Sequence, residues 1–176
     1  MAIYTKRGDK GKTNLFDTKK KVSKSSLQIE AIGKVDELNS FLGVVISFAH
    51  DPILINDLKK TQDDLLTVGS ILSGSNLHFY KTKTKRLETQ IDNLEKVLPK
   101  LKNFIFPGGT IVASLLHFAR TLTRSAERNT VTLSEQKKVR SEILVYLNRL
   151  SDYLFILARN QNFESKVNEV VWKGKK

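Results

Sequence analysis

The sequence predicts an all-α fold, a five-helix up-and-down bundle that follows an irregular N-terminal arm. Three observations support this prediction. Apolar residues recur at helical spacing through five segments, no strand-rich region is visible, and each of the three prolines falls at a break between segments. The 176 residues are enough for one core, so we expect a single domain with an arm (1–27), helices (28–164) and a basic tail (165–176).

The arm is rich in Gly, Lys, Thr and Ser and shows no helical periodicity. Its residues 5–13 read TKRGDKGKT and end in the Gly-Lys-Thr of a phosphate-binding P-loop. Lys6 stands where a P-loop needs glycine, and no helix is predicted to follow, so we reject the P-loop fold. Glycine N–H groups, lysines and threonine hydroxyls still suit a phosphate or a magnesium-bound water. A disordered basic tail is the alternative.

Residues 28–49 and 53–73 form the first two predicted helices, with Pro52 between them. A third, residues 81–98, is expected to be peripheral, because its apolar residues form only one thin seam: Leu87, Ile91, Leu94 and Leu98. The loop 103–109 then places two phenylalanines before a Pro-Gly-Gly turn, and exposed phenylalanine in a loop suggests a functional role.

The fourth predicted helix, residues 110–129, carries a charged face. Arg120, Arg124 and Arg128 recur at every fourth residue with Glu127 among them. The opposite face is predicted to join the core through Leu115, Phe118, Ala119, Leu122 and Ala126. Guanidinium groups bind carboxylate or phosphate oxygens well, so this face is interpreted as a polyanion clamp. The alternative is a solvated stripe with intrahelical Arg–Glu pairs.

The last pattern, from about Leu133 to Glu164, is apolar almost all round and predicts the central helix. Asn148, Asp152 and Phe155 share one stripe, and we expect the two polar residues to be buried with hydrogen-bond partners.

No metal site is predicted. His117 is interpreted as a hydrogen-bonded structural histidine rather than a cobalt ligand or general base, and His50 and His78 have no partner at metal-ligand spacing.

The composition indicates an anionic ligand. Thirty Lys and Arg against 18 Asp and Glu give a net charge of +12, which attracts nucleotides or nucleic acid. The lysine runs contain few aromatics, so nucleic-acid binding is not expected. The absence of cysteine suits a reducing compartment, and without a signal core or membrane span we expect a cytoplasmic protein with no membrane contact.

Five blocks, in this order, closely resemble the ATP:cob(I)alamin adenosyltransferase family. They are the glycine-rich arm, GKVDELN at 33–39, FIFPGG at 104–109, RTLTRSAER at 120–128 and LNRLSD at 147–152. The resemblance covers nearly the whole chain. It implies a five-helix bundle that assembles as a homotrimer, with the active site between neighbouring subunits.

The resemblance also implies roles for individual residues. ATP would be bound by Thr5, Lys6, Gly8, Asp9, Gly11, Thr13, Arg124, Glu127, Arg128 and Asn148, with Lys24 supplying further positive charge. Asp36 and Arg120 match a salt bridge across the subunit boundary near the corrin. Phe104 matches a residue that excludes the lower axial ligand of cobalt, and Phe155 would line the same pocket.

The implied reaction explains why the sequence shows no catalytic triad. Cob(I)alamin attacks the 5′ carbon of ATP, in the presence of Mg²⁺, and expels triphosphate, so placement and charge are the protein's tasks. A cobalt reductase and an adenosylcobalamin-dependent acceptor enzyme would be its partners. Gln28, Lys34 and Ser125 depart from the common family pattern.

Two alternatives remain open at this stage. One is a non-catalytic bundle that binds corrinoid or nucleotide, and the other is a basic helical nucleic-acid binder, which steep salt dependence would reveal.

Overall fold

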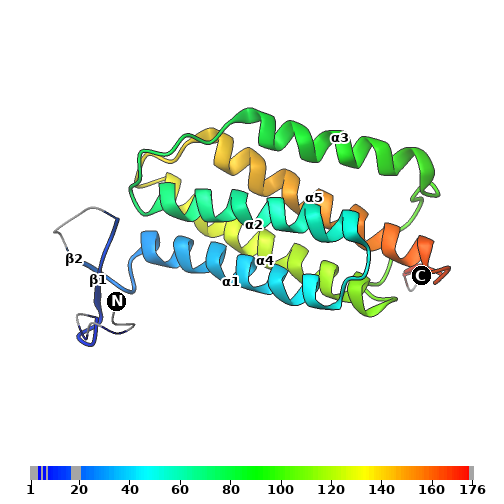
Figure 1. Ribbon diagram of the computed structural model, residues 1–176, viewed down its shortest axis with the longest axis horizontal. Helices are drawn as coiled ribbons and strands as arrows, with labels where there is room; N and C mark the ends of the chain where they lie inside the picture. The colour runs from blue at the N-terminus through cyan, green and yellow to red at the C-terminus, as the bar shows by residue number, and fades with distance from the viewer. Residues whose placement is uncertain (1–3, 5, 7, 17–20, 175–176) are drawn as a thin grey trace.

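The computed structural model describes residues 4, 6, 8–16 and 21–174. Its helices are α1 (Leu27–Phe48), α2 (Pro52–Leu72), α3 (Lys81–Val97), α4 (Ile111–Ser134) and α5 (Ser141–Glu164). Successive helices alternate in direction along one bundle, with the N-terminal arm at one end and the C-terminus at the other (Figure 1). The predicted fold class is therefore confirmed.

Side-chain caps explain where several helices begin. Ser26 accepts a hydrogen bond from the Ile29 N–H at the start of α1, and Thr110 accepts one from the Ala113 N–H at the start of α4. At the start of α2, Asp51 caps the helix and Pro52 occupies its first turn, where a missing N–H costs nothing.

One predicted boundary is wrong. The fourth helix continues to Ser134, and the fifth begins only at Ser141, so residues 133–140 are not the start of the last helix. Thr130 and Leu133 are buried, which extends the apolar face of α4 by another turn. The polar segment 135–138 then breaks the pattern.

Helix α5 is central, as predicted. It packs against α4 on one side and α3 on the other, while α1 packs against α4 and α2. The core includes fully buried leucines from these helices, among them Leu38, Leu116, Leu147 and Leu154. Helix α3 is peripheral and joins α5 through buried Leu87. None of the described helices is both long and apolar enough for a bilayer crossing.

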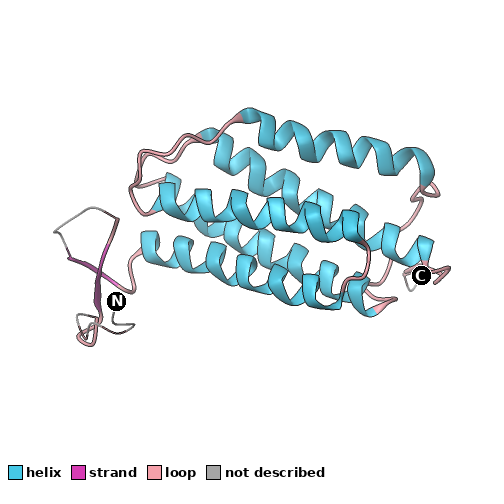
Figure 2. Ribbon diagram, viewed as in Figure 1, coloured by secondary structure: helices cyan, strands magenta, loops and turns pink. Residues whose placement is uncertain are grey.

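The arm contains a small hairpin that the sequence did not predict. Strands β1 (Lys12–Asn14) and β2 (Lys21–Ser23) pair antiparallel, with Thr13 opposite Val22 (Figure 2). Three-residue strands are too short to show a clear alternating pattern. The main-chain N–H of Phe16 also donates to the Ser73 carbonyl, 3.1 Å away, and so attaches the arm to the end of α2.

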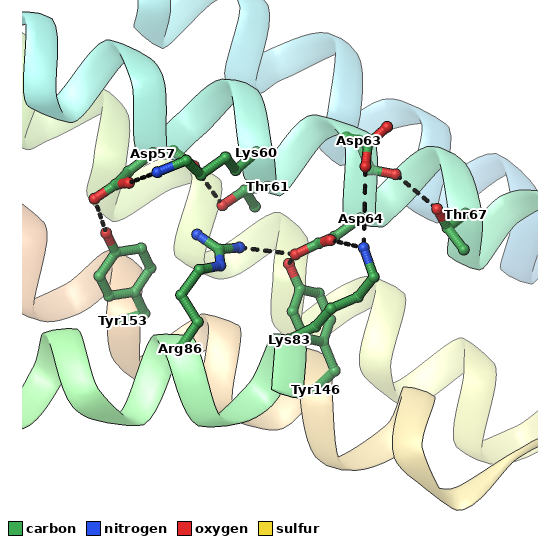
Figure 3. Close-up of polar contacts among 10 residues, drawn as sticks. All are labelled: Asp57, Lys60, Thr61, Asp63, Asp64, Thr67, Lys83, Arg86, Tyr146 and Tyr153. Atoms are coloured by element: carbon green, nitrogen blue, oxygen red, sulfur yellow. Dashed lines mark hydrogen bonds and ion pairs between the residues drawn. The ribbon is translucent and has the colours of Figure 1, made fainter. Parts of the chain in front are cut away.

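A buried polar network joins α2, α3 and α5 (Figure 3). The Asp64 carboxylate pairs with Lys83, accepts a hydrogen bond from Arg86 Nη2 at 2.8 Å and accepts another from the Tyr146 hydroxyl at 2.9 Å. Burial, followed by the Asp64 charge, raises the pKa of Tyr146 well above its usual value. The network fixes the peripheral helix α3 to the bundle.

Candidate active site

The arginine face of α4 has no neutralising partner within the described part of the chain. Arg124 and Arg128 are exposed and Arg120 is half-buried, yet none of the three forms an ion pair with a described carboxylate. Burial lowers the pKa of Arg120, and the nearby positive charge of Arg124 lowers it further. The alternative interpretation, a solvated stripe with intrahelical Arg–Glu pairs, is therefore wrong about the pairs, although Arg124 and Arg128 are exposed to solvent as it expected.

Glu127 contacts an amide instead of an arginine. Its Oε1 accepts a hydrogen bond from Asn148 Nδ2 at 2.9 Å, which links α4 to α5 beside the arginine face. Asn148 and Asp152 are exposed, and Asp152 pairs with Arg149 at 2.7 Å. The prediction that these two polar residues are buried is wrong, because their stripe is the one side of α5 that no helix covers.

A cleft of about 880 Å³ lies over α5 between α3 and α4. Arg120, Arg124 and Phe155 all line it, so the structure brings these three predicted site residues together. Helix α3 adds Asp92 and Glu95 to the opposite wall. The opposite wall also holds Lys85, so it carries charges of both signs. The cleft thus combines charged side chains with a half-buried aromatic ring, an arrangement suited to a large ligand with both polar and apolar parts.

Phe104 lies outside this cleft. It borders a neighbouring hollow of about 460 Å³ with Trp172, and Leu101 contributes to both spaces. Phe104 is 78 % exposed, so the loop does expose this phenylalanine, as the sequence predicted. In one chain, therefore, Phe104 and Phe155 line adjoining rather than identical spaces.

Asp36 and Arg120 do not meet within one chain. Asp36 is exposed on α1, and no ion pair joins it to Arg120 among the described residues. The Arg120 Nε atom is buried and has no hydrogen-bond acceptor in the described structure. A buried N–H without an acceptor destabilises the folded protein, so an acceptor from another chain or a ligand would stabilise this arrangement.

Near Arg120, α1 and α4 expose an apolar surface. Phe118 is 53 % exposed, so its predicted place in the core is wrong, and its ring instead meets that of Phe41 edge-on, with centroids 4.9 Å apart. Val44, Phe48 and Ile111 are also exposed on these helices. Several large apolar side chains exposed together are typical of a contact with another protein chain.

The glycine-rich part of the arm forms a compact turn. The Gly11 N–H donates to the Gly8 carbonyl at 3.2 Å, and the Lys24 N–H donates to the Gly11 carbonyl at 2.9 Å. A Cβ atom added to Gly8 would lie 3.2 Å from Lys24 Nζ, so the lysine ammonium group lies beside this turn. Gly11 has φ +71°, which favours glycine.

The other predicted arm residues lie near the turn or outside the described structure. Asp9 belongs to the turn, Thr13 is in β1, Lys6 adopts φ 57°, and Thr5 lies outside the described residues. The described part of the arm forms no hydrogen bond or ion pair with Arg124 or Arg128. Within one chain, therefore, the described part of the arm and the arginine face are not joined by polar contacts.

His117 is buried beside Phe155. It is 3 % exposed, and neither ring nitrogen has a hydrogen-bond partner among the described residues, so the predicted hydrogen bond is not formed. Burial lowers its pKa, and nearby Arg120 lowers it further, while Glu169 acts in the opposite direction. In the described ranges no group of three His, Cys, Asp or Glu residues gathers as metal ligands do.

Several residues near the C-terminus support the Phe104 loop, and sequence reasoning missed them. Arg159 and Asn162 of α5 are buried and contact the loop that carries Phe104, and residues 170–172 pair with that loop. The only sequence signal was the apolar triplet Val-Val-Trp in an otherwise charged tail.

Comparison with known proteins identifies a group of similar chains. A family model described as cobalamin adenosyltransferase matches residues 3–161. A corrinoid adenosyltransferase of Bacillus subtilis is 40 % identical over 181 residues, an alignment covering 98 % of this chain and 93 % of the relative. A cobalamin adenosyltransferase of Cupriavidus metallidurans is 38 % identical, with 97 % and 94 % covered.

Solved structures agree with these sequence matches. A variant PduO-type ATP:corrinoid adenosyltransferase from Lactobacillus reuteri, complexed with cobalamin and ATP, superposes with a TM-score of 0.95. It shares 37 % sequence identity, and the match covers 98 % of this chain and 100 % of that one. Another variant of the same type, complexed with ATP, gives a TM-score of 0.92 at 38 % identity, with 97 % and 100 % covered.

Proposed function

Because this chain belongs to the cobalamin adenosyltransferase family, we propose that it transfers the 5′-deoxyadenosyl group of ATP to the cobalt of cob(I)alamin. An electron pair of Co(I) forms the new bond to the 5′ carbon, and the bond from that carbon to the triphosphate oxygen breaks. The products are adenosylcobalamin and triphosphate. The observation that carries this proposal is the unpaired arginine face beside a cleft large enough for a bulky ligand.

The triphosphate is proposed to lie along the C-terminal half of α4. Arg124 and Arg128 would neutralise the charge that grows on the departing triphosphate, and the Asn148 amide, held by Glu127, would fix an oxygen. The arm would close over the phosphates with Mg²⁺ accompanying ATP, using Thr5, Lys6, Gly8, Asp9, Gly11, Thr13 and Lys24. Backbone N–H groups of such a glycine turn suit phosphate oxygens.

The corrinoid is proposed to bind next to Arg120 and Phe155. Phe104, exposed on its loop, would occupy the lower axial side of cobalt and disfavour a fifth ligand, which makes the cobalt easier to reduce. Holding cobalt and the 5′ carbon in line can contribute about 7–11 kcal/mol of the rate enhancement. No protein group needs to transfer a proton in this step.

A homotrimer with the site between subunits would complete this arrangement. Three features support it. The described part of the arm does not bond to the arginine face of its own chain, Arg120 Nε lacks an acceptor among the described residues, and α1 and α4 expose phenylalanines. Asp36 of one subunit would supply the acceptor for Arg120 of the next. The cytoplasm, a cobalt reductase and an acceptor enzyme remain the proposed location and partners.

The decisive experiment mixes the protein with ATP, Mg²⁺ and reduced cobalamin under anaerobic conditions and follows the visible spectrum of the alkylated product. Arg124→Ala is expected to lower kcat/KM for ATP by about 10²–10³, as loss of a charge-stabilising group in the transition state does. Lys59→Ala, which removes an exposed charge from α2, is the matched control and should change little. Unaltered kinetics in Arg124→Ala would remove the main support for the proposal.

The same experiment separates this enzyme from a non-catalytic binding bundle. A binding protein would hold ATP and corrinoid with the same residues but would never form the cobalt–carbon bond. Binding of both ligands without a spectral change would therefore favour that alternative.

A further inference from the structure

The Phe104 loop is anchored to the end of α5 by one buried amide. Asn162, 2 % exposed, donates from Nδ2 to the Gly108 carbonyl at 2.9 Å and accepts at Oδ1 from the Thr110 N–H at 2.9 Å. Gly109 between them has φ +110°, and a Cβ added there would clash with the Asn162 side-chain amide. The turn after Phe104 is therefore fixed in one conformation.

The middle of the loop is paired with the C-terminal tail. The Phe106 N–H donates to the Val170 carbonyl at 2.8 Å, and the Trp172 N–H donates to the carbonyl of Phe104 itself at 2.8 Å. The Trp172 ring also meets the Phe104 ring edge-on, with centroids 6.3 Å apart. The backbone position of Phe104 thus depends on where the tail lies.

The Arg159 guanidinium group holds both the tail and Pro99, in the segment that leads from α3 into the Phe104 loop. Arg159 Nε donates to Glu169 Oε1 at 2.9 Å, and Nη2 donates to Glu169 Oε2 at 3.2 Å. The same Nη2 donates to the Pro99 carbonyl at 2.8 Å. The Arg159 side chain is 7 % exposed and that of Glu169 is 21 % exposed, so this two-pronged pair is largely shielded from water.

We propose that the Arg159–Glu169 pair is a latch that holds residues 167–172 against the loop and thereby sets the position of Phe104. This inference rests on the proposed function, in which Phe104 excludes the lower axial ligand of cobalt. An isolated two-stranded contact as short as that between residues 105 and 171 is not stable in water by itself, so it needs such an anchor. Arg159 and Glu169 are positioning residues, since they act through Phe104.

The test substitutes Glu169→Gln, which keeps the shape of the side chain but removes its charge. Glu164→Gln is the matched control, because Glu164 is an exposed carboxylate at the same end of α5, and in the described structure its side chain accepts a hydrogen bond only from Asn160. The first readout needs no ligand: Trp172 is the only tryptophan, so its fluorescence anisotropy and its quenching by acrylamide report the tail. Only Glu169→Gln should lower the anisotropy and raise the quenching.

The second readout is the fraction of bound cob(II)alamin that is four-coordinate, measured by electron paramagnetic resonance with ATP present. Glu169→Gln is expected to shift the ratio of four- to five-coordinate cobalt about tenfold toward five-coordinate, equivalent to about 1.4 kcal/mol. The KM for ATP should stay unchanged. A purely structural role would lower thermal stability without moving this ratio, and that result would overturn the proposal.

A double variant tests whether Glu169 affects the cobalt coordination through Phe104. In the Phe104→Ala background, Glu169→Gln should not change the cobalt coordination further, because the group through which it acts is gone. A full additional effect would overturn the proposal. If the unsubstituted protein formed no adenosylcobalamin, the proposed function would fail, whereas the Trp172 measurements would still decide whether the latch holds the tail.

Discussion

Reversing the charges of Asp36 and Arg120 tests whether the site is shared between subunits. Arg120 is half-buried, and its Nε has no acceptor in the described chain, while Asp36 is exposed on α1 without an ion-pair partner there. The proposed trimer places Asp36 of the partner subunit at Arg120. Asp36→Arg and Arg120→Asp each bring like charges together. The double reversal restores a pair of opposite charges, with the acidic residue now on α4 and the basic residue on α1.

The free energy that each single reversal costs at a subunit interface can be estimated from the burial of Asp36 and Arg120. A buried N–H left unsatisfied costs about 1–3 kcal/mol, and breaking a fully buried ion pair costs about 3–5 kcal/mol. Arg120 is only half-buried before assembly, so we expect a value near the overlap of these ranges, about 3 kcal/mol per interface, or roughly a hundredfold in the contact equilibrium. A closed trimer repeats each contact three times, which gives about 9 kcal/mol in total.

Sedimentation velocity over a range of protein concentrations measures this effect directly. Each single reversal should dissociate the assembly at concentrations where the unsubstituted protein is trimeric, and the double reversal should recover part of the loss. Glu37→Arg is the control, since Glu37 is exposed on the same helix and, within the described residues, pairs only with Lys34 of its own turn. Strictly additive effects of the two reversals, with no recovery in the double variant, would refute the pairing.

Three further predictions concern stability and are measured by urea unfolding. Asp64→Asn removes the charge that its two cationic partners share, and it should lower the free energy of unfolding by about 3–5 kcal/mol with little loss of helix content. Tyr146 has a raised pKa in the folded state, so its contribution to the free energy of unfolding is complete below about pH 10 and is lost as the pH rises above that value. The free energy of unfolding of Tyr146→Phe should therefore fall less steeply at alkaline pH. Gly109→Ala should cost about 1–3 kcal/mol, because φ is positive and Asn162 occupies the space of a Cβ, whereas Gly108→Ala, with no atom within 4 Å of the new Cβ, should cost less.

The existence and order of the helices could be predicted because each helix has a local signal. Apolar periodicity, capping residues and prolines all act within a few positions of one another. The boundary between α4 and α5 was missed because Leu133 continues the apolar pattern of α4 and precedes another apolar segment, so periodicity alone could not divide them. The arm hairpin was missed because three-residue strands carry no period.

Site residues could be predicted from the sequence where they share one helix, but not where they come from segments far apart in the chain. The spacing of Arg120, Arg124 and Arg128 is visible in the sequence because they share one helix face. Arg159 and Asn162 are unremarkable polar residues until the fold brings them to carbonyl groups 60 and 54 positions earlier in the chain. Their partners depend on tertiary structure, which no local pattern encodes.

Helix α4 sets the order of the proposed ligands along the bundle. The Phe104 loop leads directly into its N-terminus at Thr110, Arg120 follows within the helix, and Arg124 and Arg128 lie farther toward the end where the arm begins (Figure 1). At 1.5 Å per residue, about 15 Å separate Thr110 from Arg120 along the axis, and about 12 Å separate Arg120 from Arg128. The proposed corrin contact at Arg120 and the proposed phosphate contacts at Arg124 and Arg128 are thus spaced along one rigid helix. Phe104 instead lies on the loop before this helix, so its position depends on the proposed latch.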